Sequence, residues 1–259
     1  MRILYPSDPL NPKAPDSPFA AEYDAATAVG LPCSLFSLED FDSGTFRARP
    51  SLVAGESVLY RGWMLTAERY PALAAAIRMK GAQPFTEPEY YTLCHHLPRW
   101  YPLLADCTPT TRVFAHGDDY AGALRDSGWP GYFVKDFVKS LTTTRGSFAN
   151  SPEEIAEVVA LIERYRGGIE GGVCVRHRED FVPGSERRFF VLNGKPFGAD
   201  DDIPAVVTVA AQRVASPFFS VDVAARSDGT LRIVELGDGQ VSDRKHWPVD
   251  RFVRMLASI

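Results

Sequence analysis

Cysteine and long apolar runs are scarce in this sequence. None of its apolar stretches is long enough to cross a bilayer. The four cysteines lack C-x-x-C spacing, which argues against a disulfide framework; they are Cys33, Cys94, Cys107 and Cys174. The cysteines and histidines between residues 94 and 116 match no common zinc pattern, so we expect buried cysteines and ordinary loop histidines there.

Two catalytic signatures are missing as well. The chain contains neither G-x-x-x-x-G-K-[ST] nor G-x-S-x-G. The first absence excludes a Walker-type phosphate loop. The second excludes the strand–turn–helix elbow that exposes a serine nucleophile, and no cysteine stands in a recognisable catalytic motif.

The balance of charge narrows the choice of partners. The formal net charge of −5 argues against a general nucleic-acid-coating role, but it leaves room for a local basic pocket that binds phosphate. Residues 1–6 are expected to form a short strand rather than a signal peptide, so we expect a cytoplasmic protein with no membrane partner. The oligomeric state stays open, a homodimer being one option.

The pattern along the chain predicts two domains. Residues 1–109 are expected to form a small open α/β domain with a mostly parallel sheet, because short apolar runs alternate with helical patterns. Its expected strands are 2–5, 32–37 and 58–61. Its expected helices are 20–29 and 67–80, the second capped by Thr66 and ended by Gly81. One or two helices are expected within 87–109.

Residues 110–259 are expected to form a second domain of α+β character. Its expected strands are 132–139, 172–176 and 187–192, the last followed by a two-residue turn at Asn193-Gly194. Its expected helices are 118–126, 151–165, 203–214 and 248–258. Ser151 before Pro152 is typical of a helix start.

The most informative segment is an acidic hairpin in the second domain. Asp228-Gly229 lies between two β-prone runs and predicts a two-residue turn, which pairs Ser227 with Thr230. Counting outward, Asp222 then faces Glu235. Opposed like charges destabilise a strand pair, and a divalent cation held by the two carboxylates would offset the repulsion. A slipped register with both acids solvated is the alternative.

A basic strand and a polar loop form a second candidate feature. In the strand expected at 132–139, alternation places Lys135, Phe137 and Lys139 on one face. The loop 142–147 follows, with hydroxyl groups, an arginine and a glycine that lets backbone amides approach an anion. Two lysines beside such a loop indicate a polyphosphate site. The alternative is a solvated edge strand with an ordinary turn.

Two other strands carry charge where their apolar runs end. The run 173–176 leads into His-Arg-Glu179, and such an edge can line a purine while its backbone bonds the base. A plain core strand is the alternative. Around the strand 187–192, alternation puts Glu186 and Arg188 on one face, which suggests either a charged site wall or solvated strand ends.

The order of these parts resembles the ATP-grasp superfamily. A lysine strand, a polar loop, a helix, an apolar strand with a charged exit, an E-x-R strand, a helix and an Asp…Glu hairpin follow one another as in that fold. The pieces VKDFVKS…RGS, ERRFFVLNGKP and VDVA…DG.L.IVELGDGQ resemble the group called the R2K clade. The resemblance covers roughly residues 112–245. The preceding α/β domain is similar to the one that usually precedes an ATP-grasp core.

The resemblance implies a role for each candidate residue. Lys135 and Lys139 would contact ATP phosphates, and Arg188 would face the transferred phosphate, so Arg188 and Lys139 are the catalytic candidates. The other nucleotide contacts implied are Thr143, Gly146, Ser147, Cys174, Val175, Arg176, Glu179 and Glu186. Magnesium would bind at Asp222 and Glu235. Many members carry Glu-x-Asn at the last metal strand, whereas here Gly237 takes the Asn position and Asp238 is the nearest oxygen ligand.

The resemblance also implies an enzyme. It predicts an ATP- and magnesium-dependent ligase that joins a carboxylate to an amine, or to a thiol, through an acyl-phosphate. The partners would be a small-molecule or peptide acid and an amine, whose identities the sequence does not reveal. The alternatives are an ATP-binding module without ligase activity, an ATP-grasp kinase of small molecules, and a purely structural α/β protein.

Overall fold

The computed structural model describes residues 1–141 and 143–258, so Thr142, part of the predicted phosphate loop, lies outside the described residues. The chain packs as two compact units. One unit consists of residues 1–92, 188–221 and 237–259, and the other of residues 93–187 and 222–236. These packing units do not test the domain boundary expected at residue 109, which stays a prediction.

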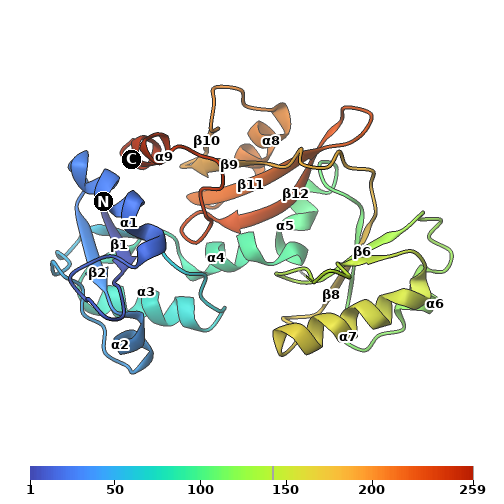
Figure 1. The fold of residues 1–259 in the computed structure, drawn as a ribbon, viewed down its shortest axis with the longest axis horizontal. Coiled ribbons are helices and arrows are strands. Elements are labelled where there is room, and N and C mark those ends of the chain that lie inside the picture. The colour runs from blue at the N-terminus through green and yellow to red at the C-terminus, as the bar shows by residue number, and fades with distance from the viewer. Residues whose placement is uncertain (142, 259) are drawn as a thin grey trace. The chain divides into compact units, whose positions relative to one another are not determined.

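The first unit contains the parallel sheet that the sequence predicted. Its strands are β1 (Arg2–Pro6), β2 (Cys33–Phe36), β3 (Ser57–Tyr60) and β4 (Gln83–Pro84), in the order β2-β1-β3-β4. All three strand pairs are parallel. In Figure 1 these strands and their connecting helices run from blue to cyan. The expectation of an open α/β arrangement in this part is confirmed.

The predicted helices of this unit begin and end close to the expected positions, whereas the short helices at 17–19 and 38–42 were not predicted. The helices are η1 (Ser17–Phe19), α1 (Ala20–Ala28), α2 (Leu38–Asp42), α3 (Arg69–Met79), α4 (Pro88–His95), α8 (Ala205–Arg213) and α9 (Val249–Leu256). Helix α3 starts two residues later than expected. The Thr66 hydroxyl still accepts a hydrogen bond from the Arg69 N–H at 3.3 Å, so it satisfies one of the free donors at the helix start.

The core of the first unit joins segments from both ends of the sequence. Ile3 and Tyr5 of β1 share one hydrophobic cluster with Phe190 and Phe218, and with Phe252 of α9. The Phe190 ring lies 5.0 Å from the Phe252 ring in an edge-to-face arrangement. The first strand and the last helix therefore complete the same core.

A fully buried ion pair lies beside this core. Arg61, directly after β3, binds Glu22 of α1 through two hydrogen bonds of 2.7 and 2.8 Å. Its Nη1 also donates to three backbone carbonyl oxygens, those of Gly239, Gln240 and Ser242. Both side chains are at most 3% exposed. Because the guanidinium is so fully satisfied, it fixes the segment 239–242 against the parallel sheet.

The second unit contains an antiparallel sheet covered by one long helix. Its strands are β5 (Thr111–Phe114), β6 (Tyr132–Asp136), β7 (Phe148–Ala149) and β8 (Val173–His177), in the order β5-β8-β6-β7. Its helices are α5 (Leu97–Leu104), α6 (Tyr120–Leu124), η2 (Pro152–Glu154) and α7 (Ile155–Arg166). Buried residues of α7 pack against Val134 of β6 and Val175 of β8. Gly167 ends α7 with a φ of 79°, where a side chain would be strained.

A third sheet is formed by β9 (Arg187–Leu192), β10 (Lys195–Phe197), β11 (Phe218–Ala225) and β12 (Leu231–Asp238), in the order β10-β9-β11-β12. The turn at Asn193-Gly194 is confirmed. Both residues have positive φ values, 49° and 74°, and Leu192 pairs with Lys195.

The helices described for residues 1–141 and 143–258 include none long and apolar enough to span a membrane.

The lysine strand is shorter than predicted. β6 ends at Asp136, whose carboxylate accepts hydrogen bonds from the Val138 and Lys139 N–H groups at 2.7 and 2.5 Å. This local bonding turns the chain, because an Asp side chain competes with the strand for backbone donors. The expectation that Lys135, Phe137 and Lys139 share one strand face is therefore wrong, and Lys139 is exposed in the turn.

The acidic hairpin also differs from the prediction. The Arg226 N–H bonds the Thr230 carbonyl at 2.8 Å, so three residues form the turn, with Gly229 at a φ of 85°. The expected pairing of Ser227 with Thr230 is wrong by one residue. Counting back from the Arg226–Thr230 pair places Asp222 opposite Val234, so the two carboxylates are not directly opposed.

The buried Arg61–Glu22 pair generates a stability prediction. Glu22→Gln leaves the guanidinium buried without a countercharge, and we expect the free energy of unfolding to fall by about 3–5 kcal/mol. Urea denaturation followed by circular dichroism measures the loss. Asp24→Asn, on the exposed side of the same helix, is the matched control and should change stability by less than about 0.5 kcal/mol. Equal stability of the two variants would refute the importance of the pair.

Candidate functional site

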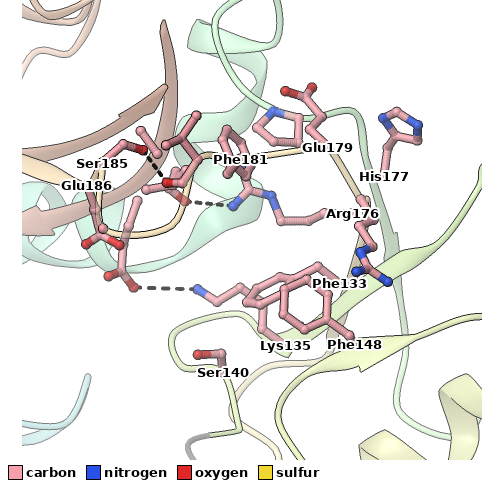
Figure 2. A pocket seen from close by; sticks show the side chains of 17 residues that line it. Phe133, Lys135, Ser140, Phe148, Arg176, His177, Glu179, Phe181, Ser185 and Glu186 are labelled. Atoms are coloured by element: carbon pink, nitrogen blue, oxygen red, sulfur yellow. Dashed lines mark hydrogen bonds and ion pairs between the residues drawn. The ribbon is translucent and has the colours of Figure 1, made fainter. Parts of the chain in front are cut away.

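A cavity of about 310 Å³ lies within the unit of residues 93–187 and 222–236 (Figure 2). This volume is at the lower end of the range for small-molecule sites, roughly 300–1,000 Å³. Its apolar lining consists of Pro109, Phe133, Phe148, Phe181, Val182, Ala224 and Val234. Its polar lining consists of Lys135, Ser140, Arg176, His177, Arg178, Glu179, Ser185, Glu186 and Glu235, with Gly184 between them. The cavity thus combines aromatic surface with buried cations and carboxylates.

Lys135 is the buried cation of this cavity. The side chain is 8% exposed, and its Nζ donates to the Val138 carbonyl at 3.0 Å and lies 3.9 Å from the Glu235 carboxylate. Burial lowers the pKa of this ammonium below the ordinary lysine value, the nearby Glu235 opposes the shift, and Arg176 adds to it. An anion in the cavity would therefore gain a strong electrostatic partner.

Arg176 is held in a fixed position beside Lys135. Its guanidinium donates to the Val234 carbonyl at 2.6 Å and to the Thr108 hydroxyl, and burial lowers its pKa to about 10. Its Nε is buried without a hydrogen-bond partner among the described residues. A second cation thus lines the cavity close to the first.

Only part of the segment that was predicted to bind a purine lies at the cavity. Strand β8 is paired with β5 on one side and β6 on the other from Val173 to Arg176. The prediction that this stretch offers its backbone to a base is therefore wrong. Cys174 is fully buried, and Val175 packs in the core against α7, so neither lines the cavity. The last residue of β8, His177, does line it, as do Arg178, Glu179, Phe181 and Val182 after the strand.

Within this segment, the Glu179 carboxylate is bound by arginine side chains. Its carboxylate is bound by Arg232 through two contacts of 3.1 Å, and Arg226 lies 3.8 Å away. Arg232 in turn donates to the Asp106 and Thr108 carbonyls. Because the carboxylate is already saturated by arginines, it holds the cavity wall in place and has little capacity left for a ligand.

The polar loop is adjacent to the cavity. The Ser147 hydroxyl accepts from the Leu141 N–H at 2.7 Å and is thereby committed to the loop itself. Gly146 has a φ of 68°, and the Thr143 hydroxyl is buried with no hydrogen-bond partner among the described residues. The lining residues Ser140 and Phe148 flank the loop on either side. Phosphate contacts by Thr143, Gly146 and Ser147 stay a prediction.

Glu186 and Arg188 have different surroundings. Glu186 is exposed and lines the cavity. Arg188 belongs to the other unit, where its guanidinium donates to the Asp243 carbonyl and carboxylate at 3.1 and 3.2 Å. The catalytic roles expected for Arg188 and Lys139 stay predictions, and neither residue lines the cavity.

The predicted metal ligands have different environments. Glu235 lines the cavity, and Asp222 is buried in β11. Asp238 is fully buried, and its carboxylate accepts from the Gln240 N–H at 3.0 Å and the Gln240 amide at 3.1 Å. Burial raises the Asp238 pKa to about 7. No three His, Cys, Asp or Glu side chains among the described residues are grouped to hold a metal ion, so the metal assignment stays a prediction.

Sequence reasoning missed the aromatic lining. Phe133 and Phe148 meet edge to face with ring centroids 5.3 Å apart, and the Arg178 guanidinium lies 4.9 Å from the Phe148 ring. Figure 2 shows both rings on the cavity side, near Lys135. Phe133 was within reach of the alternation rule, because it precedes Lys135 by two positions on one strand face. Nothing in the sequence pattern singles out Phe148 or Phe181.

Comparison with known sequences identifies one matching family. The profile described as "ATP-grasp domain, R2K clade family 3" matches residues 126–256, just over half of the chain. The search of curated proteins found no match.

Solved structures of ATP-grasp ligases share the whole fold. D-cycloserine synthetase DcsG has a TM-score of 0.68 at 18% identity, covering 100% of this chain and 99% of that chain. The D-alanine-D-alanine ligase from Coxiella burnetii has a TM-score of 0.65 at 12% identity, covering 100% and 90%. The ligase PsnB, in complex with a minimal precursor, Mg and ADP, has a TM-score of 0.62 at 14% identity, covering 99% and 97%. At these identities the likeness establishes the fold, which the sequence had predicted.

The lowered pKa of Lys135 predicts proton uptake on anion binding. A polyanion in the cavity favours the charged ammonium and raises its pKa back toward the ordinary value, so binding takes up as much as one proton between the two pKa values. The uptake should grow as the pH rises above neutral. Calorimetric titration of inorganic triphosphate in buffers of different ionisation enthalpy measures it. Equal uptake by Lys135→Met would contradict the assignment.

The raised pKa of Asp238 predicts a pH-dependent stability. The folded state binds this proton more tightly than the unfolded chain, so the stabilisation is complete below about pH 4 and is lost as the pH rises through about 7. In EDTA, Asp238→Asn should remove this loss, which is on the order of 4 kcal/mol. Thermal melts at several pH values measure it, with the exposed Asp126→Asn as control. Parallel profiles for wild type and Asp238→Asn would refute the buried titration.

Proposed function

Because the chain belongs to the R2K clade of the ATP-grasp superfamily, we propose that it is an ATP-dependent ligase that joins a carboxylate to an amine. One observation carries the proposal. The cavity places the buried Lys135 ammonium 3.9 Å from the Glu235 carboxylate, next to aromatic side chains. A nucleoside triphosphate has three parts that these groups can bind. Aromatic side chains suit its flat apolar base, the ammonium suits its anionic tail, and the carboxylate suits a cation bound to that tail.

The aromatic part of the cavity suits the base. Phe133, Phe148 and Phe181 offer apolar faces, and a purine ring stacks on such faces. In the segment 177–182, His177 is still paired with Tyr132, and the Arg178 and Val182 N–H groups bond the Gly131 and Ala225 carbonyls. The backbone between Arg178 and Val182 is therefore the part of this segment that a base edge can approach. We assign base binding to this segment.

The charged part of the cavity suits the phosphates. Lys135 and Arg176 are cations held in a low-dielectric setting, where they stabilise a developing negative charge more than they would in water. Arg176 is fixed by the Val234 carbonyl, so its position needs no adjustment when the phosphates bind. We assign phosphate binding to these two residues.

The donor set also fits magnesium. Mg²⁺ is commonly held by one or two carboxylates together with substrate phosphates and water, so a cage of three protein carboxylates is not required. Glu235 is a carboxylate at the cavity, and Asp222 and Asp238 are the other expected ligands. The ion would offset charge on the phosphates during transfer.

The reaction follows from these assignments. An oxygen of the substrate carboxylate attacks the γ-phosphorus of ATP, the bond to the β-phosphate oxygen breaks, and ADP leaves with that electron pair. An amine then attacks the acyl carbon, the carbon–oxygen bond to phosphate breaks, and an amide, phosphate and a proton result. No protein nucleophile takes part, and the side chains act by position and charge.

The names of the structural neighbours support a ligase. DcsG is called a D-cycloserine synthetase, the protein from Coxiella burnetii a D-alanine-D-alanine ligase, and PsnB an ATP-grasp ligase, with one structure in complex with a precursor peptide. These proteins cover both small-molecule and peptide substrates. We therefore propose a small-molecule or peptide acid and an amine as substrates of this chain, and leave their identities to a substrate screen.

The proposal predicts ADP release that depends on Glu235. With candidate acids and amines, wild-type protein should release ADP and phosphate, and Glu235→Gln should lower kcat/KM by about 100-fold or more, because a charged partner of the reacting phosphates is lost. A coupled ADP assay measures the rate, with Glu153→Gln on the second unit's surface as control. Full activity of Glu235→Gln would refute the metal and phosphate assignment.

The same assay separates the alternatives. Binding of ATP without turnover on any acid and amine would favour a nucleotide-binding module. A stable phosphorylated product, in place of ADP, phosphate and an amide, would favour a small-molecule kinase. No change in melting temperature with ATP and Mg²⁺ would argue against nucleotide binding altogether.

A further inference from the structure

Arg176 lines the cavity as a buried cation with no carboxylate in ion-pair contact among the described residues (Figure 2). The residue is 5% exposed, and Glu235 and Glu179 act on its charge only from a distance. Of the five N–H donors of a guanidinium, two have partners in the described part of the chain. Nη1 donates to the Val234 carbonyl at 2.6 Å, and Nη2 to the Thr108 hydroxyl at 2.5 Å. The guanidinium is thus held at one edge and still has donors for an anion.

Thr108 fixes this edge through its hydroxyl. The residue is fully buried, and its Oγ1 donates to the Ile233 carbonyl of β12 at 2.7 Å. A hydroxyl has a single hydrogen, so the one on Thr108 is committed to that carbonyl and a lone pair faces Arg176. The direction of donation from Arg176 to Thr108 and on to Ile233 is therefore determined.

Thr108 is itself anchored to β12. The carbonyl of the residue before it accepts from the Ile233 N–H at 2.8 Å, and its own carbonyl accepts from Arg232 Nη2 at 2.5 Å. The other acceptor of the guanidinium, the Val234 carbonyl, belongs to the same strand. Both groups that hold the guanidinium are consequently tied to one strand, which keeps their separation constant.

We propose that Thr108 is a positioning residue that holds the Arg176 guanidinium in place for the anionic tail of the nucleotide. The inference rests on the proposed function, which assigns phosphate binding to Lys135 and Arg176. An arginine side chain that is free to rotate loses conformational freedom when an anion orders it, and this loss weakens binding. The Thr108 hydroxyl orders the guanidinium before the anion arrives. Thr108 does not line the cavity, so its effect on a ligand passes through Arg176.

The test measures binding of inorganic triphosphate in EDTA, so that no metal ion takes part. Thr108→Val keeps the shape of the side chain and removes the hydroxyl. We expect it to weaken triphosphate affinity about 3- to 10-fold, because ordering of the released arginine then opposes binding. Adenosine affinity should change less than about two-fold, since no assigned base contact is altered. Equilibrium dialysis measures both affinities, and an equal loss for adenosine would overturn the inference.

Two matched variants separate positioning from packing. Thr108→Ser loses a buried methyl group but keeps the hydroxyl, so it should lose thermal stability and retain triphosphate affinity. Thr111→Val removes a nearby buried hydroxyl, which donates to the Pro109 carbonyl at 2.9 Å and does not bond Arg176. It should also retain triphosphate affinity. A loss in either variant as large as that in Thr108→Val would overturn the inference, since loosening of the segment would then explain all of them.

A double-mutant cycle tests whether Thr108 acts through Arg176. Arg176→Met removes the guanidinium, and in that background Thr108→Val should have no further effect on triphosphate affinity. An equal weakening by Thr108→Val in both backgrounds would overturn the inference, because the hydroxyl would then act on the ligand by another route.

The outcomes also distinguish this inference from the proposed function. If wild type binds triphosphate and folded Thr108→Val binds it equally well, only the role of Thr108 is overturned. If wild type binds no triphosphate, or if folded Arg176→Met binds it as well as wild type does, the phosphate assignment of the proposed function falls, and the inference with it.

A structure of wild type with ADP tests the point without any variant. We expect a phosphate oxygen in hydrogen-bond contact with the Arg176 guanidinium while Nη2 stays on the Thr108 hydroxyl. A guanidinium that leaves Thr108 to reach the phosphates would overturn the inference, as would phosphates that do not touch Arg176.

Discussion

The unit that contains both ends of the described chain depends on one buried guanidinium. Arg61 is surrounded by two carboxylate oxygens and three carbonyl oxygens, and its Cζ lies 4.7 Å from the centroid of the Phe252 ring. A charge buried in this way is tolerated only when its donors are satisfied. The helix α1, the end of β3 and the segment 239–242 must therefore adopt their positions together, and that segment carries the residues that hold Asp238.

Two of the buried cations among the described residues, Arg61 and Lys135, differ in how their charge is compensated. Burial lowers the pKa of Arg61, but the Glu22 carboxylate and its hydrogen bonds outweigh this effect and raise it overall. Lys135 has only a carboxylate 3.9 Å away, and burial prevails, so its pKa is lowered. The charge and hydrogen-bond donors of Arg61 are satisfied by other groups of the protein, and the residue stabilises the fold. The second cation is paired with Glu235 at 3.9 Å and still has a lowered pKa, so an anionic ligand would stabilise its charged form.

The sequence predicted the elements well and their ends less well. Apolar periodicity and helix-end residues located the parallel sheet, α7 and the turn at Asn193-Gly194, since these signals are local. The two errors both came from short-range bonding that competes with regular structure. Asp136 captured two backbone donors and ended β6 early. One extra residue in the turn before Thr230 shifted the register of the hairpin, and a single step moves every side chain to another partner.

The sequence pointed to the charged residues that line the candidate site and missed the aromatic ones. Lys135, Arg176, Glu179 and Glu235 line the cavity, and each stood out as a charged residue in or beside a β-prone run. Phe148 and Phe181 are ordinary aromatic residues until the fold brings them together. Thr108 carries no charge, and its importance depends on partners 68 and 125 positions away, Arg176 and Ile233, which no local pattern connects.

The shared core of β1 and α9 has a consequence for how the protein is made. Ile3 and Tyr5 are synthesised first, but the residues that cover them in α9 follow only after some 240 others. The Gly239 carbonyl that binds Arg61 likewise lies 178 positions later in the chain. At a synthesis rate of roughly 5–20 residues per second, it is added roughly 10–35 s after Arg61. During that interval the nascent chain exposes apolar side chains of the parallel sheet, and Arg61 has its Glu22 partner but lacks its three carbonyl acceptors. Its yield in a cell should therefore depend on holding chaperones more than that of a protein whose early segments close on themselves.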